Sequence, residues 1–115
     1  MPGTTTLSEH IRSLMIAFGI SPHELAQVLQ TSDRTVLRWL ADDTYPQHET
    51  RKMLDELDAL VHRLHTSFDP PEAAEAWLRS ESGYFGGLRP MDALLRGRVD
   101  AVNSALEALD SGVFV

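Results

Sequence analysis

The sequence predicts an all-α protein with three parts: an N-terminal helix-turn-helix bundle, a long connecting helix and a small helical C-terminal domain. Apolar residues recur at spacings of three and four along most of the chain, which is typical of helices that bury one face. Hydroxyl residues with capping spacing precede several of these segments, and no segment shows strand-like alternation. At 115 residues the chain has the length of one ordinary domain or two very small ones. A partner can therefore supply part of its burial.

Composition restricts the class of protein. The formal net charge is -7 and there is no cysteine, which excludes disulfide frameworks and cysteine-based metal sites. The acidic balance argues against indiscriminate nucleic-acid binding, because lysine and arginine carry that binding. The N-terminal segment has neither a basic start nor a long apolar run, and no segment reaches the roughly 18 apolar residues of a membrane span. We therefore expect a cytoplasmic protein with no membrane partner.

Residues 1–45 predict three short helices. Thr6 and Ser21 are each followed three residues later by a glutamate, the spacing of a capping box, and Ser32 precedes the third helix. Gly19 is placed to end the first helix. The apolar positions at helical spacing are Ile11, Leu14, Met15, Phe18, Leu25, Val28, Leu29, Val36, Leu37 and Leu40.

Residues 46–69 predict the longest helix, from about Gln47 to Phe68. Its apolar stripe consists of Met53, Leu54, Leu57, Leu60, Val61, Leu64 and Phe68. A stripe of this width buries one face of a helix. We expect this helix to connect the two ends of the chain and to form a homodimer.

Residues 70–115 predict a separate helical domain. Pro70 and Pro71 end the long helix and begin the next one, and Pro90 opens another after the loop SESGYFGGL. Gly112 is a natural left-handed cap for the last helix, and it is followed by the apolar tail VFV.

Residues 21–46 have the arrangement of a helix-turn-helix, two short helices joined by about three residues. The second helix directs Asp33, Arg34, Thr35 and Arg38 outward, and Ser32 stands at its start. Arginine bonds both acceptors of a guanine edge, threonine contacts a thymine methyl or a phosphate, and a helix N-terminus favours phosphate. The predicted DNA contacts are Ser32, Arg34, Thr35 and Arg38. The predicted inner contacts are Leu25, Val28, Leu29, Val36 and Leu37, with Trp39 at the far end.

The alternative for this segment is a helical hairpin that packs and reads no DNA. Residues 1–45 hold three arginines against five acidic residues, and Gln30 stands where this motif commonly has a glycine. With so little positive charge, DNA binding would need a dimer that presents two reading helices.

Two stretches resemble known families. The helix pair of residues 21–46 resembles Xre-like helix-turn-helix regulators. The residues that carry this resemblance are Leu25, Ala26, Thr35, Val36, Arg38 and Trp39. The second half resembles the C-terminal domain of the Xre/MbcA/ParS antitoxin family, and the two together cover nearly the whole chain. The matching residues of that half are Trp77, Leu78, Gly86, Gly87, Pro90, Leu94, Leu95, Gly97, Val102, Leu106, Leu109, Gly112, Val113 and Phe114. Family members often have Arg-Thr-Pro where this chain has Leu88, Arg89 and Pro90.

The resemblance implies an antitoxin of a type II toxin-antitoxin system. Its partner would be a RES-domain toxin that consumes NAD, whose active-site entrance the C-terminal tail approaches or fills. The DNA-binding half would repress the shared operon by binding operator DNA. The loop SGYFGG lacks the Lys-Ser or Lys-Thr of a phosphate loop and no catalytic pair stands out, so we expect no enzyme activity and no cofactor. The predicted toxin contacts are Tyr84, Phe85, Leu88, Arg89, Gly112, Val113, Phe114 and Val115.

Other interpretations remain open from the sequence. Tyr84, Phe85 and the tail can instead pack within the C-terminal helices. The chain can also be a stand-alone transcriptional regulator whose C-terminal half oligomerises or senses a ligand. Asp58, His62 and His65 lie on one side of the long helix at spacings that can hold a metal, as in a metal-dependent enzyme. A solvated polar face is the favoured explanation, because the three lie away from the apolar stripe.

Overall fold

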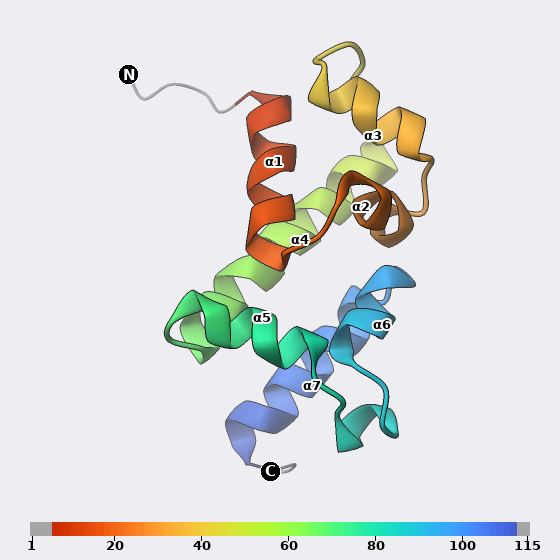
Figure 1. Ribbon diagram of the computed structural model, residues 1–115. Coiled ribbons are helices and arrows are strands. Elements are labelled where there is room, and N and C mark those ends of the chain that lie inside the picture. The colour runs from red at the N-terminus through yellow and green to blue at the C-terminus, as the bar shows by residue number, and fades with distance from the viewer. Residues whose placement is uncertain (1–5, 113–115) are drawn as a thin grey trace.

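The computed structural model describes residues 6–112, and this part of the chain is all-helical, as the sequence predicts. Within it lie seven α-helices, one short 3-10 helix and no strand. The helices are α1 (Leu7–Phe18), α2 (Pro22–Leu29), α3 (Asp33–Leu40), α4 (His48–Ser67), α5 (Pro71–Arg79), the 3-10 helix η1 (Gly83–Phe85), α6 (Pro90–Leu95) and α7 (Val99–Ser111). Figure 1 shows α4 running through the molecule, with α1 to α3 at one end and α5 to α7 at the other. None of the helices in residues 6–112 is long and apolar enough to cross a membrane.

The starts of the first three helices follow the predicted caps. The hydroxyls of Thr6 and Ser21 each accept a hydrogen bond from the backbone of the third helical residue, and the glutamates at those positions complete both capping boxes. The Ser32 hydroxyl accepts from the backbone N–H of Thr35 at 3.1 Å. Gly19 ends α1 in the left-handed conformation. Local sequence therefore determines where α1, α2 and α3 begin.

The core of the molecule is built around α4. Its apolar stripe is buried at Leu54, Leu57, Leu60 and Leu64, and the helix packs against α1 and α2 on one side of the chain and α5 and α7 on the other. Buried residues from all seven α-helices join in one hydrophobic cluster. Because this stripe is used within the chain, the homodimer expected from α4 would need side chains outside it.

Besides its buried side chains, three contacts link α5 to α1, α2 and α4. The ring of Trp77 lies 5.6 Å from the ring of Phe68 at the end of α4. The guanidinium of Arg79 donates a hydrogen bond of 2.8 Å to the carbonyl of Gly19 at the end of α1, and it lies 3.8 Å from the carboxylate of Glu24 on α2. Helix α5 is thus held against the ends of α1 and α4 and against α2.

Gly97, between α6 and α7, packs closely against the last turn of α2. Its φ is +77°, and a Cβ added there would lie 3.1 Å from the carbonyl oxygen of Val28. We expect Gly97→Ala to lower the free energy of unfolding by roughly 2–3 kcal/mol, through backbone strain plus overpacking. Gly86 is the matched control, since it has φ +65° and no atom within 4 Å of an added Cβ.

Urea unfolding of the two variants tests this close approach. Gly86→Ala reports the backbone term alone, about 1 kcal/mol. Equal losses for the two variants would show that the contact with Val28 contributes nothing.

Candidate functional site

The turn between α2 and α3 keeps the geometry of a helix-turn-helix although it lacks a glycine. Gln30 adopts the left-handed conformation, with φ 58° and ψ 43°. Its side-chain amide donates a hydrogen bond of 2.7 Å to the carbonyl of Gln27, and the N–H of Thr31 donates to the carbonyl of Ala26 at 2.9 Å. These bonds satisfy the last carbonyls of α2. The departure from glycine at position 30 therefore leaves the turn intact.

The predicted DNA contacts lie at the start and on the outward face of α3. Arg34 and Arg38 are exposed, while Thr35 is half-buried. The Thr35 hydroxyl lies 2.9 Å from the Ser32 hydroxyl, so these two groups are paired with each other. The structure thus leaves two guanidinium groups projecting from this helix and holds the two hydroxyls at its N-terminus.

Leu37 corrects one prediction. The sequence placed it among the inner contacts of the helix pair, but 54% of its surface is exposed. Val36 and Trp39, which were also predicted as inner contacts, are buried, at 0% and 3%. Successive residues of a helix are separated by about 100°, so a helix this short that buries Val36 turns its neighbour away from the core.

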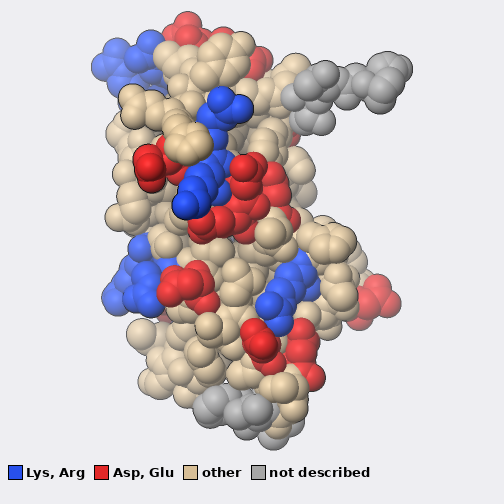
Figure 2. All heavy atoms as spheres, turned by 180° about the vertical axis from the view of Figure 1, so that it is seen from behind, with Lys and Arg blue, Asp and Glu red and all other residues tan. Residues whose placement is uncertain are grey.

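The acidic residues around α3 have partners within the chain. Asp33 lies 2.9 Å from His23, and Asp43 lies 3.5 Å from Arg38. Asp42 accepts hydrogen bonds from the backbone N–H and the hydroxyl of Ser8. Among residues 6–112, no carboxylate pairs with Arg34. The acidic excess of the N-terminal bundle is therefore partly engaged internally, and Figure 2 shows basic and acidic side chains interspersed on the back face of the molecule.

The loop that contains the predicted toxin contacts is compact. The N–H of Ser82 donates to the carbonyl of Leu88 at 3.0 Å, which closes the loop at its base. The rings of Tyr84 and Phe85 meet edge to face, with centroids 5.1 Å apart, and both side chains are half-buried. Leu88 is 53% exposed. The loop thus presents an apolar side chain on a braced backbone.

A hollow of about 190 Å³ lies beside this loop. The loop, α6, α7 and the segment between these helices supply its lining, which consists of Phe85, Leu88, Arg89, Asp92, Ala93, Arg96, Arg98 and Ala101. The arginines of RPMDALLRGR are the sequence signal for this part of the hollow. Arg96 and Arg98 were not among the predicted toxin contacts. The hollow combines apolar side chains with three arginines, of which Arg89 and Arg98 are ion-paired with Asp92 and Asp100. Apolar and arginine side chains are both common in protein interfaces.

Arg89 is fixed by an acidic neighbour. Its guanidinium donates a hydrogen bond of 2.8 Å to the Asp92 carboxylate, and its backbone N–H donates to the same carboxylate at 2.9 Å. These bonds lower the pKa of Asp92, with the side-chain bond from Arg89 as the main cause. Any partner therefore meets the guanidinium of Arg89 in a position set by α6.

The tail contacts are only partly within the described residues. Gly112 ends α7 with φ 77°, in the left-handed conformation predicted for it. Val113, Phe114 and Val115 lie outside the described residues.

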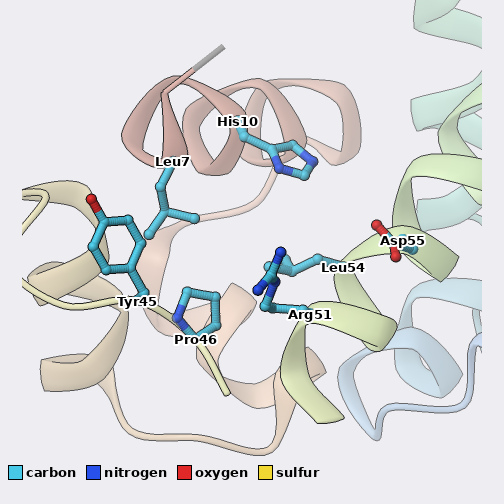
Figure 3. Close-up of a pocket in the computed structure, with 7 residues that line it drawn as sticks. All are labelled: Leu7, His10, Tyr45, Pro46, Arg51, Leu54 and Asp55. Carbon is cyan, nitrogen blue, oxygen red and sulfur yellow. The ribbon is translucent and has the colours of Figure 1, made fainter. Parts of the chain in front are cut away.

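A second hollow, of about 340 Å³, lies between α1, α4 and the segment that joins α3 to α4 (Figure 3). Leu7 and Tyr45 face each other on one side, and Arg51 points into it from α4. Tyr45 is 79% exposed. No sequence pattern marked this hollow, because its lining comes from three separate segments.

The candidate metal ligands on α4 do not form a cluster. The Asp58 carboxylate lies 2.7 Å from Nε2 of His10 on α1, a contact between segments far apart in the sequence. Within residues 6–112, no group of three histidine or carboxylate side chains is arranged to hold a metal.

Comparison with known proteins agrees with this arrangement. A family model described as the antitoxin Xre/MbcA/ParS C-terminal toxin-binding domain matches residues 63–112. A probable mycobacterial cidal antitoxin, Rv3188 of Mycobacterium tuberculosis, is 35% identical over 98 residues, which is 85% of this chain and 83% of that protein. The mycobacterial cidal antitoxin MbcA of Mycobacterium bovis is 27% identical, over 98% of this chain and 99% of that protein.

A solved structure extends the likeness to the fold. A chain of the M. tuberculosis MbcT-MbcA toxin-antitoxin complex matches with a TM-score of 0.67 and 25% identity, over 97% of this chain and all of that one. The C-terminal domain and the all-helical fold define a class of all-helical antitoxins. The chain belongs to the Xre/MbcA/ParS antitoxin family.

Proposed function

We propose that this chain binds and neutralises a cognate RES-domain toxin that consumes NAD, as the antitoxin of a type II toxin-antitoxin system. Its C-terminal tail blocks the entrance of the toxin's active site. Its helix-turn-helix represses the shared operon, as part of a homodimer within a larger toxin-antitoxin complex.

The observation that carries this proposal is the likeness, along nearly the full chain, to one component of a toxin-antitoxin complex. A match limited to the helix-turn-helix would support only a regulator. This match includes the C-terminal half, which the family model describes as toxin-binding.

The loop of residues 81–89 supports a protein-binding role for that half. Exposed Leu88 stands beside the 190 Å³ hollow, and Phe85 extends from the loop into its lining. Aromatic and arginine side chains around such hollows supply most of the binding energy of protein interfaces. Tyr84, Phe85, Leu88 and Arg89 are therefore our candidate toxin contacts, together with Gly112 and the tail.

The exposed arginines of α3 support the DNA-binding role. Arg34 and Arg38 project from the helix that a helix-turn-helix inserts in the major groove, and the Ser32 cap orients its N-terminus. Because a single copy carries few basic groups, two reading helices related by a two-fold axis fit this function better than one.

Co-expression with the candidate toxin tests the role of the tail. The full chain should protect cells and preserve their NAD, while a chain ending at Ser111 should do neither. A variant with Val113, Phe114 and Val115 all replaced by serine keeps the chain length and removes only the apolar side chains. Equal protection by the full and shortened chains would overturn the proposed blocking role.

A further inference from the structure

The outward face of α3 carries an apolar side chain between its two arginines. Leu37 is 54% exposed, with Arg34 one turn before it and Arg38 directly after it. Ala41, at the end of the helix, continues the same face and is also exposed. Burying a leucine in contact with another apolar group is favourable, so this side chain gains from a partner.

The charges around Leu37 favour DNA as that partner. Leu37 is flanked by two guanidinium groups on the helix that this motif places in the major groove, where arginine bonds phosphates and guanine edges. Arg34 has no carboxylate partner within residues 6–112, and the Arg38–Asp43 pair is exposed at both ends and weak enough to rearrange. A polyanion satisfies both arginines at once, and the 5-methyl group of thymine is the apolar feature that base edges present in the major groove.

Thr35, the other candidate for contact with a thymine methyl, is less exposed than Leu37. It is half-buried, and its hydroxyl lies 2.9 Å from Ser32 at the N-terminus of the helix. Leu37 lies further along α3 and projects outward. Leu37 is therefore the better candidate for the apolar contact, and the Thr35 hydroxyl pairs with Ser32 at the start of α3.

We propose that Leu37 is a specificity-determining residue that contacts the 5-methyl group of a thymine in each half-site of the operator. The inference rests on the proposed DNA-binding role of the helix-turn-helix. It adds an apolar base contact between the contacts made by the two arginines.

Replacement of thymine by deoxyuridine tests this contact, because it removes only the 5-methyl group. The probe is a duplex from the promoter of the chain's own operon, in which each thymine of the footprint is replaced in turn. The wild-type chain should lose about fourfold in affinity at one thymine per half-site, as expected for one buried methyl group. Leu37→Ala should bind the unmodified duplex about fourfold more weakly or worse, and should be insensitive to deoxyuridine at that same thymine.

Ile16→Ala is the matched control, since Ile16 is an exposed aliphatic residue of α1, 80% exposed and outside α3. It should retain wild-type affinity and the wild-type response to deoxyuridine. If wild-type and Leu37→Ala chains respond equally at every thymine, the inference is wrong while the DNA-binding role stands. If Leu37→Ala changes the sedimentation coefficient of the protein but not its affinity for DNA, Leu37 contacts another protein chain rather than DNA. If the wild-type chain does not bind the promoter, the DNA-binding role fails and the inference falls with it.

Discussion

Replacing both Arg34 and Arg38 with alanine is expected to abolish operator binding and to leave toxin neutralisation intact. Each arginine that bonds a guanine edge contributes about 1–3 kcal/mol, so losing both lowers affinity by at least about 30-fold. Both side chains are exposed, and no core contact depends on them. Fluorescence anisotropy with promoter DNA at fixed salt measures the first effect, and co-expression with the toxin measures the second.

Lysine provides the control that separates charge from geometry. A chain with Arg34→Lys and Arg38→Lys keeps both positive charges but loses the planar fork that bonds two acceptors of one base. It should retain much of its affinity for unrelated DNA and lose its preference for the operator. If the alanine variant binds the operator as tightly as the wild-type chain, α3 is not the reading helix. If it also fails to neutralise the toxin, the two functions share a dimer or the variant is misfolded.

Local signals in the sequence were sufficient to predict the starts of α1, α2 and α3. The capping spacing of Thr6 and Ser21 predicted the starts of α1 and α2, and Gly19 predicted the end of α1, because these bonds are formed within a few residues. The left-handed turn at Gln30 could not be predicted from residue type, since its side-chain bond to Gln27 takes the place of a glycine. Leu37 was assigned to the wrong face for a different reason. In an eight-residue helix, a shift of one position still fits an apolar pattern.

Contacts between distant segments were beyond sequence reasoning. The pairing of His10 with Asp58 joins positions 48 residues apart. The close approach of Gly97 to Val28 likewise depends on the whole arrangement of α2, α6 and α7. The loop residues Phe85, Leu88 and Arg89 were predicted from a resemblance. The opposite wall of their hollow, with Ala93 and Ala101, appears only when α6 and α7 are folded beside the loop.

The N-terminal bundle is not expected to fold by itself, although it carries the complete helix-turn-helix. In a fragment of residues 1–69, α4 loses α5 and α7, so Leu60 and Leu64 lose part of the cluster in which they are buried. The last turn of α2 also loses its contact with Gly97, and the end of α1 loses the hydrogen bond from Arg79. Domains of this size have only about 5–15 kcal/mol of stability to lose. Circular dichroism during urea titration should show a cooperative transition for the full chain and none for the fragment.

A full-length chain with Leu60→Ala is the control for the fragment, because it weakens the core without removing any helix. Leu60 is fully buried, and its truncation should cost about 2–5 kcal/mol while leaving a single cooperative transition. A fragment that unfolds cooperatively at the midpoint of the full chain would show that α5, α6 and α7 add nothing to the core around α4. If only the full chain unfolds cooperatively, the two halves fold as one unit although their DNA-binding and toxin-binding surfaces are separate. Under that condition, Arg34 and Arg38 can be altered without affecting the toxin surface, whereas a change at Leu60 or Gly97 weakens both functions together.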